Sequence, residues 1–246
     1  MTPYLQFQSL EKRYGAVTAL SEINLTVERG DVLAFLGPNG AGKSTLFGCL
    51  LGFTRPTAGA ILQDGKPISV AQRQGFGYMP ERIALYPHSS VLENGMFFAQ
   101  LKDQSAQELE RQLKRVGLYH VRDRQARQLS KGMLQRLGLA IALCGEPGLL
   151  ILDEPFNGLD PALLETLQAM LAEEHGHGAT ILVSTHTMSA VEPLATHVAV
   201  LLEGRLAAHG SIEELRRQHS ESASLEAIYH RIARERRPVM AEEVWA

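Results

Sequence analysis

The clearest chemistry in the sequence lies in a glycine-rich stretch, GPNGAGKST, at residues 37–45. Its glycines let the backbone curl so that N–H groups face the oxygens of a bound phosphate. Lys43 adds a positive charge, and the hydroxyl of Ser44 can bind Mg²⁺. Because a strand-like run precedes the stretch and a helix-like run follows it, the spacing predicts a nucleotide site. This phosphate loop consists of Gly37, Pro38, Asn39, Gly40, Ala41, Gly42, Lys43, Ser44 and Thr45.

A second candidate is the acidic pair Asp153 and Glu154, which ends the apolar run LLILDEP. A buried strand that ends here would place both carboxylates at the carboxyl edge of a parallel sheet, beside the phosphate loop. We predict that Asp153 holds Mg²⁺ through water and that Glu154 polarises the attacking water.

A second anion site is predicted by QLSKGMLQR, from Gln128 to Arg136. Its Ser-Lys-Gly segment leads into an apolar helix, and the first N–H groups of a helix attract anions. This loop lies far along the chain from the phosphate loop, so it raises the question of which phosphate it would bind.

The elements that would position these residues follow from the pattern of apolar residues. Strand-like runs open the chain, residues 91–143 are helical in pattern, and strand and helix then alternate. This order predicts an α/β fold with a mainly parallel sheet and an inserted helical segment. The helix boundaries are predicted by capping boxes at Ser105/Glu108 and Ser211/Glu214 and by Asp160 before Pro161.

Composition limits the classes of function. The chain has 246 residues, 45% of them hydrophobic, and a net charge of −3, so no basic field would collect nucleic acid. Cys49 and Cys144 fall in apolar helical runs and are expected to be buried core residues. The first residues do not read as a signal peptide, and no apolar run approaches the length of a membrane span, so we expect a protein that does not itself cross a membrane.

These motifs, taken in order, resemble the nucleotide-binding subunit of ATP-binding cassette (ABC) transporters, over about Leu5 to Gln218. The resemblance implies a P-loop NTPase (RecA-like) core with an antiparallel β subdomain and an inserted helical subdomain. It also implies ATP and Mg²⁺ as ligands and ATP hydrolysis as the activity. The implied division is an ATP-binding core at 1–86 and 149–218, a helical subdomain with the signature loop at 87–148, and a C-terminal extension at 219–246.

In that family the signature loop binds the γ-phosphate of ATP held by a partner subunit. The resemblance therefore implies that Ser130 and Gly132 serve the nucleotide of a second cassette, either another copy of this chain or a related one, across a two-fold interface. Lys131 and Met133 depart from the commonest family form. Lys131 could add charge toward the γ-phosphate or face solvent, and we favour solvent.

Four further residues receive roles from the resemblance. Tyr14 matches the aromatic that stacks on adenine, and His186 matches the histidine that contacts the γ-phosphate and helps to hold the water and Glu154. Asp160 matches the distal-loop aspartate. Glu81 stands where the family usually has glutamine; it could still reach Mg²⁺ or the lytic water, but it adds negative charge to the site.

The segment PE at Glu81, the SKGM signature and the tail SLEAIYHRI look most like exporter-type cassettes, which handle drugs, lipids, ions or copper with separate membrane subunits. A peripheral position on the cytoplasmic face of the cell membrane is implied, with the membrane subunit docking near Glu81 to Pro87. In this scheme ATP binding closes the dimer and hydrolysis resets it.

Two other classes fit the sequence less well. Soluble ABC-family ATPases of DNA repair carry long coiled coils between the two loops, and those of translation carry two cassettes in one chain. The interval here is short and lacks heptads, and the sequence shows one cassette. A kinase or GTPase would not explain LSKGM or STH. His175 and His177 are read as a solvated turn rather than a metal site.

Overall fold

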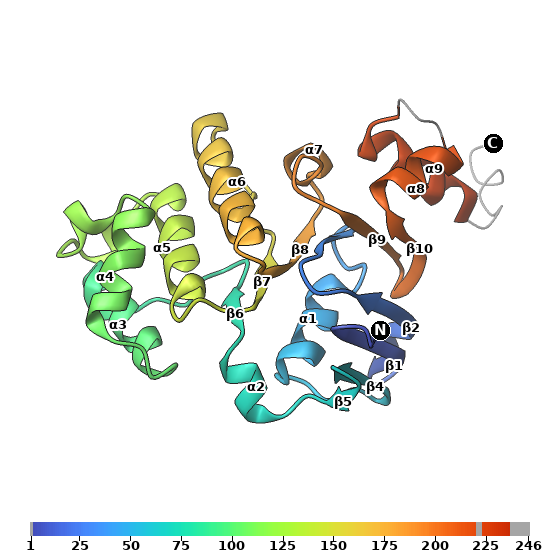
Figure 1. Cartoon of the computed structure of the whole chain (residues 1–246), viewed down its shortest axis with the longest axis horizontal. Coiled ribbons are helices and arrows are strands. Elements are labelled where there is room, and N and C mark those ends of the chain that lie inside the picture. The colour runs from blue at the N-terminus through green and yellow to red at the C-terminus, as the bar shows by residue number, and fades with distance from the viewer. Residues whose placement is uncertain (1, 220–222, 237–246) are drawn as a thin grey trace, which may run out of the picture.

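The computed structural model describes residues 2–219 and 223–236. Two β-sheets lie side by side, and a group of helices stands apart from them at one end of the molecule (Figure 1). No helix among the described residues is long and apolar enough to span a membrane.

The larger sheet has six strands in the order β10-β9-β3-β8-β7-β6. Neighbours from β9 to β6 are parallel, and β10 pairs antiparallel with β9. Strands β3, β7 and β8 are buried along their whole length, as parallel strands covered on both faces must be. The predicted mainly parallel sheet is therefore confirmed. Its strands are β3 (Val32–Leu36), β6 (Gly77–Met79), β7 (Leu149–Asp153), β8 (Thr180–Thr185), β9 (His197–Leu202) and β10 (Arg205–Ser211).

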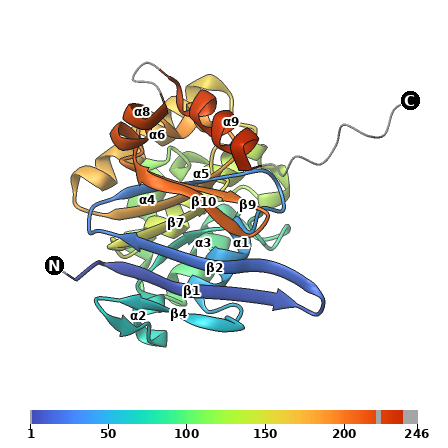
Figure 2. The same cartoon turned by 90° about the vertical axis from the view of Figure 1, so that its right-hand side faces the viewer.

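The smaller sheet is antiparallel, in the order β2-β1-β4-β5, and it faces the viewer in Figure 2. This sheet confirms the antiparallel β unit that the family resemblance implies. Its strands are β1 (Leu5–Tyr14), β2 (Val17–Val27), β4 (Ala58–Gln63) and β5 (Lys66–Pro67).

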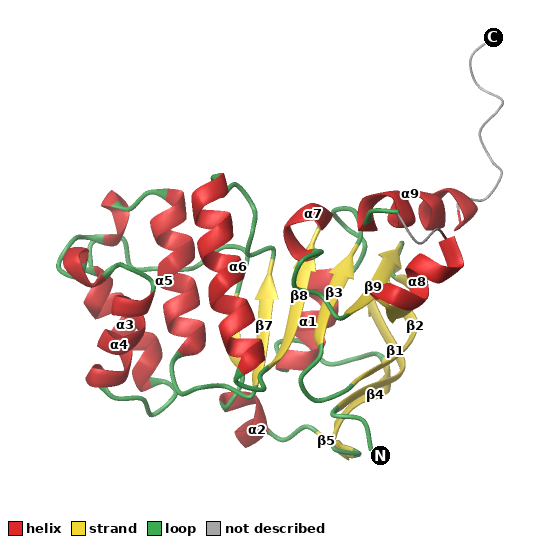
Figure 3. Ribbon diagram, turned by 45° about the horizontal axis from the view of Figure 1, so that its top comes forward, coloured by secondary structure: helices red, strands yellow, loops and turns green. Residues whose placement is uncertain are grey.

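Helices cover the larger sheet and extend beyond it (Figure 3). We call α3, α4 and α5 the helical group; α6 stands between this group and the sheet (Figures 1 and 3). The helical group consists of α3 (Val91–Gln100), α4 (Ala106–Arg115) and α5 (Lys131–Leu143), with short 3-10 turns at Tyr119–Val121 and Ala126–Gln128. The other helices are α1 (Lys43–Leu51), α2 (Val70–Gln74), α6 (Pro161–Gly176), α7 (Met188–Val191), α8 (Ile212–His219) and α9 (Leu225–Arg236).

The core has two apolar clusters, one on each face of the larger sheet, because successive side chains of a strand point to opposite faces. In β3, Ala34 belongs to the cluster beneath the helical group and α6, whereas Phe35 packs with α1 and the smaller sheet. Cys49 and Cys144 are both buried, one in each cluster, as predicted.

The predicted helix caps are confirmed in part. Asp160 accepts a hydrogen bond from the N–H of Leu163, and Ser211 and Glu214 form both bonds of their capping box. At α4 only half of the predicted box forms: Ser105 accepts from the N–H of Glu108, but the carboxylate of Glu108 turns to Arg111. A charged guanidinium is a stronger donor than a backbone N–H, which explains the difference.

The C-terminal helix α9 packs on the core through Leu225, Ile228 and Ile232. For Glu226 to Ala246 the sequence leaves a packed helix and a loose tail open, and its charged end, residues 231–246, suggests a loose tail. That expectation is wrong for residues 231–236, which continue α9 because Ile232 is buried against the core; residues 237–246 lie outside the described residues.

Candidate active site

The phosphate loop connects β3 to α1, as predicted. Gly42 shows why glycine is needed at the entry to α1: its φ is 105°, and an added Cβ would lie 2.7 Å from the carbonyl oxygen of Ala19. The Nζ of Lys43 donates a hydrogen bond to the carbonyl oxygen of Gly37 at 2.7 Å, and only 6% of Lys43 is exposed. The loop therefore holds its lysine in a fixed direction.

A cavity of about 270 Å³ opens at this loop. The predicted residues Glu81 and Glu154 line it together with the loop, so the structure brings the basic and acidic parts of the predicted site to one place. Tyr14 does not line this cavity; it lies at the end of β1 with 51% of its surface exposed, and Nζ of Lys12 is 4.7 Å from its ring centroid. The cavity is lined by Ala19, Pro38, Asn39, Gly40, Ala41, Gly42, Lys43, Ser44, Thr45, Glu81 and Glu154.

The acidic pair sits where the carboxyl ends of β7 and β8 meet, with Asp153 paired in register with Ser184. Ser184 is fully buried; its hydroxyl donates to Oδ1 of Asp153 and accepts from the N–H of Glu154. One hydroxyl thus orients both acidic residues. Burial, together with the charge of Asp153, raises the pKa of the neighbouring Tyr78 to about 12, so that phenol stays neutral beside the carboxylate.

The sequence analysis assigns no role to Ser184, although it is the first residue of the STH segment that contains His186. We expect Ser184→Ala to lower kcat about tenfold, because the carboxylate of Asp153 loses a buried hydrogen bond worth about 1.5–3 kcal/mol and the backbone N–H of Glu154 loses its hydroxyl acceptor. The matched control is Thr180→Val, which removes another buried hydroxyl of β8, one that accepts a hydrogen bond from the N–H of Gly30 and bonds neither acidic residue in the part of the chain that the structure describes. Steady-state hydrolysis and thermal unfolding of both variants check this; equal kcat in the two would contradict it.

The carboxylate of Glu154 lies between the side chains of His186 and Lys43. Its Oε2 is 2.8 Å from Nδ1 of His186, and its Oε1 is 3.3 Å from Nζ of Lys43. Glu154 is 6% exposed, and its Oε1 makes no hydrogen bond within the described part of the chain. Its φ of 51° is a strained conformation for a residue with a side chain, held by the bonds from its N–H to Ser184. Oε1 is therefore a buried acceptor beside the cavity.

The residues present fit a magnesium ion chemically. Ser44 and Glu81 supply oxygen atoms to the lining of the cavity, and Asp153 presents a buried carboxylate at the adjacent strand end. Hydroxyl, carboxylate and water oxygens are the ligands that Mg²⁺ prefers. The donor set therefore suits the ion that the sequence predicts.

The second loop lies outside this cavity. Ser130 caps α5 by accepting a hydrogen bond from the N–H of Met133, and it is exposed. Gly132 lies against α6, since an added Cβ would be 2.3 Å from Cδ1 of Leu163. Lys131 is exposed, and its Nζ lies over Gly158 of the distal loop, 2.2 Å from where a Cβ would stand. Ser130 and Gly132 thus do not line the cavity of this chain's own phosphate loop.

The segment after Glu81 is anchored by a residue that the sequence analysis missed. Asn94 of α3 is fully buried and exchanges hydrogen bonds with the backbone of Tyr86, at 2.7 and 3.0 Å. Tyr86 itself is 54% exposed, and its ring packs edge-on against Phe97, which is 42% exposed. An exposed aromatic surface is therefore held on a rigid loop.

Comparisons with known proteins agree with this geometry. A model of the family "ABC transporter" matches residues 20–157. The chain is 36% identical to the lantibiotic transport ATP-binding protein SrtF of Streptococcus pyogenes, over 92% of this chain and 96% of that protein. It is 38% identical to the Nod factor export ATP-binding protein I of Cupriavidus metallidurans, over 87% of this chain and 73% of that protein. A solved structure titled as the ATP binding subunit of an ABC transporter superposes with a TM-score of 0.85 at 33% identity, covering 94% of this chain and 99% of that one.

Proposed function

The chain belongs to the ABC transporter family as an ATP-hydrolysing ATP-binding cassette, and from this premise we propose which residues bind ATP, which hydrolyse it and which contact the partner subunits. The observation that carries the proposal is the buried Oε1 of Glu154, a residue that lines the phosphate-loop cavity: this oxygen forms an ion pair with Lys43 at 3.3 Å but accepts no hydrogen bond from the described residues. A water beside that oxygen would be placed for attack on a phosphate held by the loop.

The proposed hydrolysis uses each residue at a stated atom. The phosphate loop and Lys43 bind the β- and γ-phosphates, so Nζ of Lys43 exchanges its contacts with loop carbonyls for phosphate oxygens. Oε1 of Glu154 accepts the hydrogen bond of the attacking water and polarises it. His186, 2.8 Å from Oε2, orients the carboxylate and contacts the γ-phosphate. The hydroxyl of Ser184 orients the backbone N–H of Glu154 and the carboxylate of Asp153 through its two hydrogen bonds.

We propose that Mg²⁺ is held by Ser44 and, through water, by Asp153, with Glu81 as the third oxygen donor. When bound, the ion would neutralise charge that develops on the phosphate oxygens. Glu81 lines the cavity together with Lys43 and Ser44, which supports its place near the phosphates.

We further propose that the second loop acts on the partner's nucleotide. Ser130 and Gly132 begin α5 and lie outside the cavity that Lys43 lines, so they do not serve the ATP of their own chain. An exposed helix beginning with a serine cap suits an anion that approaches from another molecule. Asp160 and the distal loop lie beside it, because Lys131 covers Gly158. Two copies of this chain would then close around two ATP molecules in a two-fold dimer.

The division into a core at 1–86 and 149–218, a helical subdomain at 87–148 and an extension at 219–246 is part of the same proposal. It is supported by the separate position of the helical group in Figure 1. The phosphate loop and the acidic strand end belong to the core, and the second loop belongs to the helical subdomain. Each protomer would thus present two different anion-binding elements.

For the membrane partner, we propose a peripheral cassette on the cytoplasmic face that docks a membrane subunit near Glu81 to Pro87 and works in export. The exposed pair Tyr86 and Phe97, held by Asn94, offers apolar surface of the kind that takes up a helix. Relatives named for lantibiotic transport and for Nod factor export support the direction.

Recovery of the chain from its native membranes tests the partner. The tagged chain is extracted in mild detergent, with Tyr86→Ala/Phe97→Ala as the matched variant. Co-purification of a multi-span protein that the double variant loses would support the docking site. Recovery from the soluble fraction alone would point instead to a soluble ABC-family ATPase, and a partner that the variant retains would overturn the docking site.

Tyr14 gives a prediction for nucleotide binding. We expect Tyr14→Ala to raise the KM for ATP about tenfold with little change in kcat, because aromatic stacking on a base is worth about 1–3 kcal/mol and is present before and during hydrolysis. Tyr14→Trp should keep the wild-type KM. Steady-state kinetics of both variants check this, and an unchanged KM in Tyr14→Ala would remove Tyr14 from the adenine site.

A further inference from the structure

The helical group packs along α6, where Leu139 of α5 shares the core with Leu167 and Met170, and two further contacts lie toward the ends of α6. Near the beginning of α6, Gly132 packs against Leu163. Near its end, Nη2 of Arg115 from α4 forms ion pairs with Glu173 at 2.9 Å and Glu174 at 2.7 Å. Positions 163 and 173 are separated by about 15 Å along the helix, at 1.5 Å per residue. Two contacts this far apart hold the helical group in one orientation on α6.

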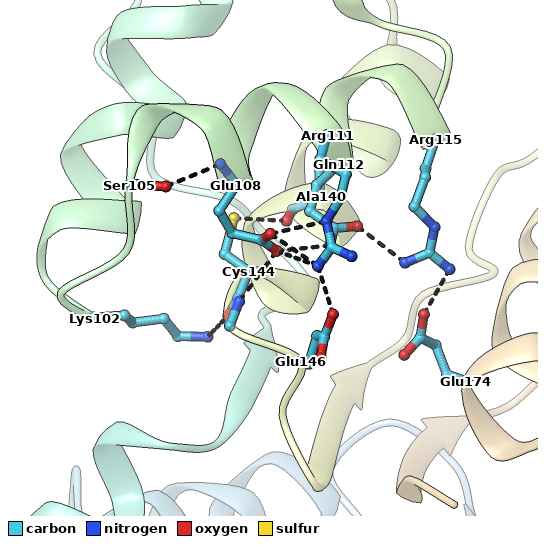
Figure 4. Close-up of polar contacts among 11 residues, drawn as sticks. Lys102, Ser105, Glu108, Arg111, Gln112, Arg115, Ala140, Cys144, Glu146 and Glu174 are labelled. Atoms are coloured by element: carbon cyan, nitrogen blue, oxygen red, sulfur yellow. Dashed lines mark hydrogen bonds and ion pairs between the residues drawn. The ribbon is translucent and has the colours of Figure 1, made fainter. Parts of the chain in front are cut away.

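The pair of Arg115 with Glu174 is part of a partly buried polar network, shown in Figure 4. Gln112 is fully buried; its Nε2 donates to Oε1 of Glu108 at 2.8 Å, and its Oε1 accepts from Nη1 of Arg115 at 3.1 Å. Glu174 is 8% exposed. Burial alone would lower the pKa of Arg115, but the hydrogen bonds to Glu174 and Glu173 raise it, so the guanidinium stays charged. The network therefore fixes the direction of Arg115.

A cavity of about 460 Å³ lies between α4 and the end of α6, with Arg111, Gln112 and Arg115 on one side and Glu173 and Glu174 on the other. Close apolar packing does not fill this space, so contact between the two helices here depends on side chains that reach across it. Arg115 is the side chain that does so.

We propose that Arg115 is a positioning residue for ATP hydrolysis, which fixes the helical group to the end of α6 and so aims the beginning of α5, with Ser130, at the partner's nucleotide. The inference rests on the proposed action of Ser130 in the partner's site. Without the ion pairs of Arg115, α4 is no longer tied to the end of α6, so the helical group can tilt on the remaining apolar contacts of α5 and the first N–H groups of α5 change direction. Hydrogen bonds weaken steeply with misalignment, so the partner's γ-phosphate is held less well.

Arg111 provides a matched control on the same helix, one turn before Arg115. It also pairs with two carboxylates, Glu108 and Glu146, each at 2.8 Å. Both partners precede β7, so these pairs do not reach α6. Arg111→Met therefore removes the same charge and the same number of ion pairs while the contact with α6 stays.

The experiment measures kcat, KM for ATP and thermal unfolding for Arg115→Met, Arg111→Met and Arg115→Lys. We expect Arg115→Met to lower kcat about tenfold with KM within about twofold of wild type, since ATP still binds at its own phosphate loop. Arg111→Met should keep most of the wild-type kcat, and Arg115→Lys should restore part of it. A kcat for Arg115→Met no lower than that of Arg111→Met would overturn the proposal.

Loss of Arg115 leaves the buried carboxylate of Glu174 without its partner, which can unfold the chain. Arg115→Met combined with Glu174→Gln removes that charge. This double variant should unfold at a temperature close to wild type and still show the lowered kcat; wild-type kcat in it would overturn the role of Arg115. Ser130→Arg, measured alongside, separates the two claims, because undiminished hydrolysis in Ser130→Arg would refute the partner-site function itself.

Discussion

Glu154→Gln is expected to lower kcat about 10³-fold while ATP stays bound, because an amide cannot accept the proton that the attacking water must lose. The geometry supports a large effect: Oε1 is buried beside the cavity, it accepts no hydrogen bond from the described residues, and the Lys43 ammonium that lies 3.3 Å from it would turn to the bound phosphates. Single-turnover hydrolysis and the amount of ATP retained after gel filtration measure the two parts of the prediction.

Lys43→Ala serves as the contrasting variant for Glu154→Gln. Removal of the lysine charge should weaken ATP binding itself, because Nζ is the point charge of the phosphate loop. The two variants should therefore both be inactive but differ in retained nucleotide. Steady-state hydrolysis at the wild-type rate in Glu154→Gln would remove Glu154 from its role.

Ser130→Arg is expected to lower kcat about 10²-fold without weakening ATP binding at the chain's own phosphate loop. Ser130 is exposed at the start of α5 and lies outside the cavity that Lys43 lines, so a large side chain there leaves that cavity intact. It would, however, stand between α5 and the partner's γ-phosphate, where loss of a donor costs about 10²–10³ in kcat. Hydrolysis and equilibrium nucleotide binding measure the two effects.

Arg127→Ala is a suitable control for Ser130→Arg, because it changes a charge in the same segment, where the guanidinium of Arg127 donates to the side chain of Gln125 and its backbone N–H, which the substitution keeps, donates to Pro87. It should leave kcat close to wild type. Weaker ATP binding in the Ser130→Arg monomer would contradict an action on the partner's nucleotide.

The sequence predicts the parts of the site that depend on local spacing. The phosphate loop needs glycine at positions such as Gly42, where φ is positive and the backbone of Ala19 is close, and such needs leave a readable pattern. The acidic pair is equally readable, since a wholly apolar run ending in two carboxylates predicts a buried strand with its end at the sheet edge.

The parts that the sequence misses depend on contacts between distant segments. Ser184 matters because β8 pairs with β7 in a register that sets it opposite Asp153, and one residue of slip would turn it to the other face. Asn94 reads as an ordinary polar residue of a helix, like Glu93 beside it, until its bonds to the backbone of Tyr86 are seen. Tertiary contacts of this kind carry no short-range signal.

The partners of charged side chains are also hard to predict from the sequence. Only one of the two hydrogen bonds of the predicted capping box at Ser105 and Glu108 forms, because the carboxylate of Glu108 pairs with Arg111 instead of the N–H of Ser105. For Lys131 the sequence leaves two directions open, toward solvent or toward phosphate. The residue is exposed, but its ammonium lies over Gly158; a Cβ at position 158 would leave no room for it. A long charged side chain can reach several partners, and the fold determines which of them lies close enough to pair with it.

Light scattering on the Glu154→Gln chain, with saturating ATP and Mg²⁺, would show whether the second loop binds a partner's nucleotide. The proposal predicts twice the mass of one chain with ATP, the mass of one chain without it, and the mass of one chain with ATP when Ser130→Arg is added. A dimer that survives Ser130→Arg, or a chain that binds ATP and stays single, would contradict the action of Ser130 on the partner's γ-phosphate.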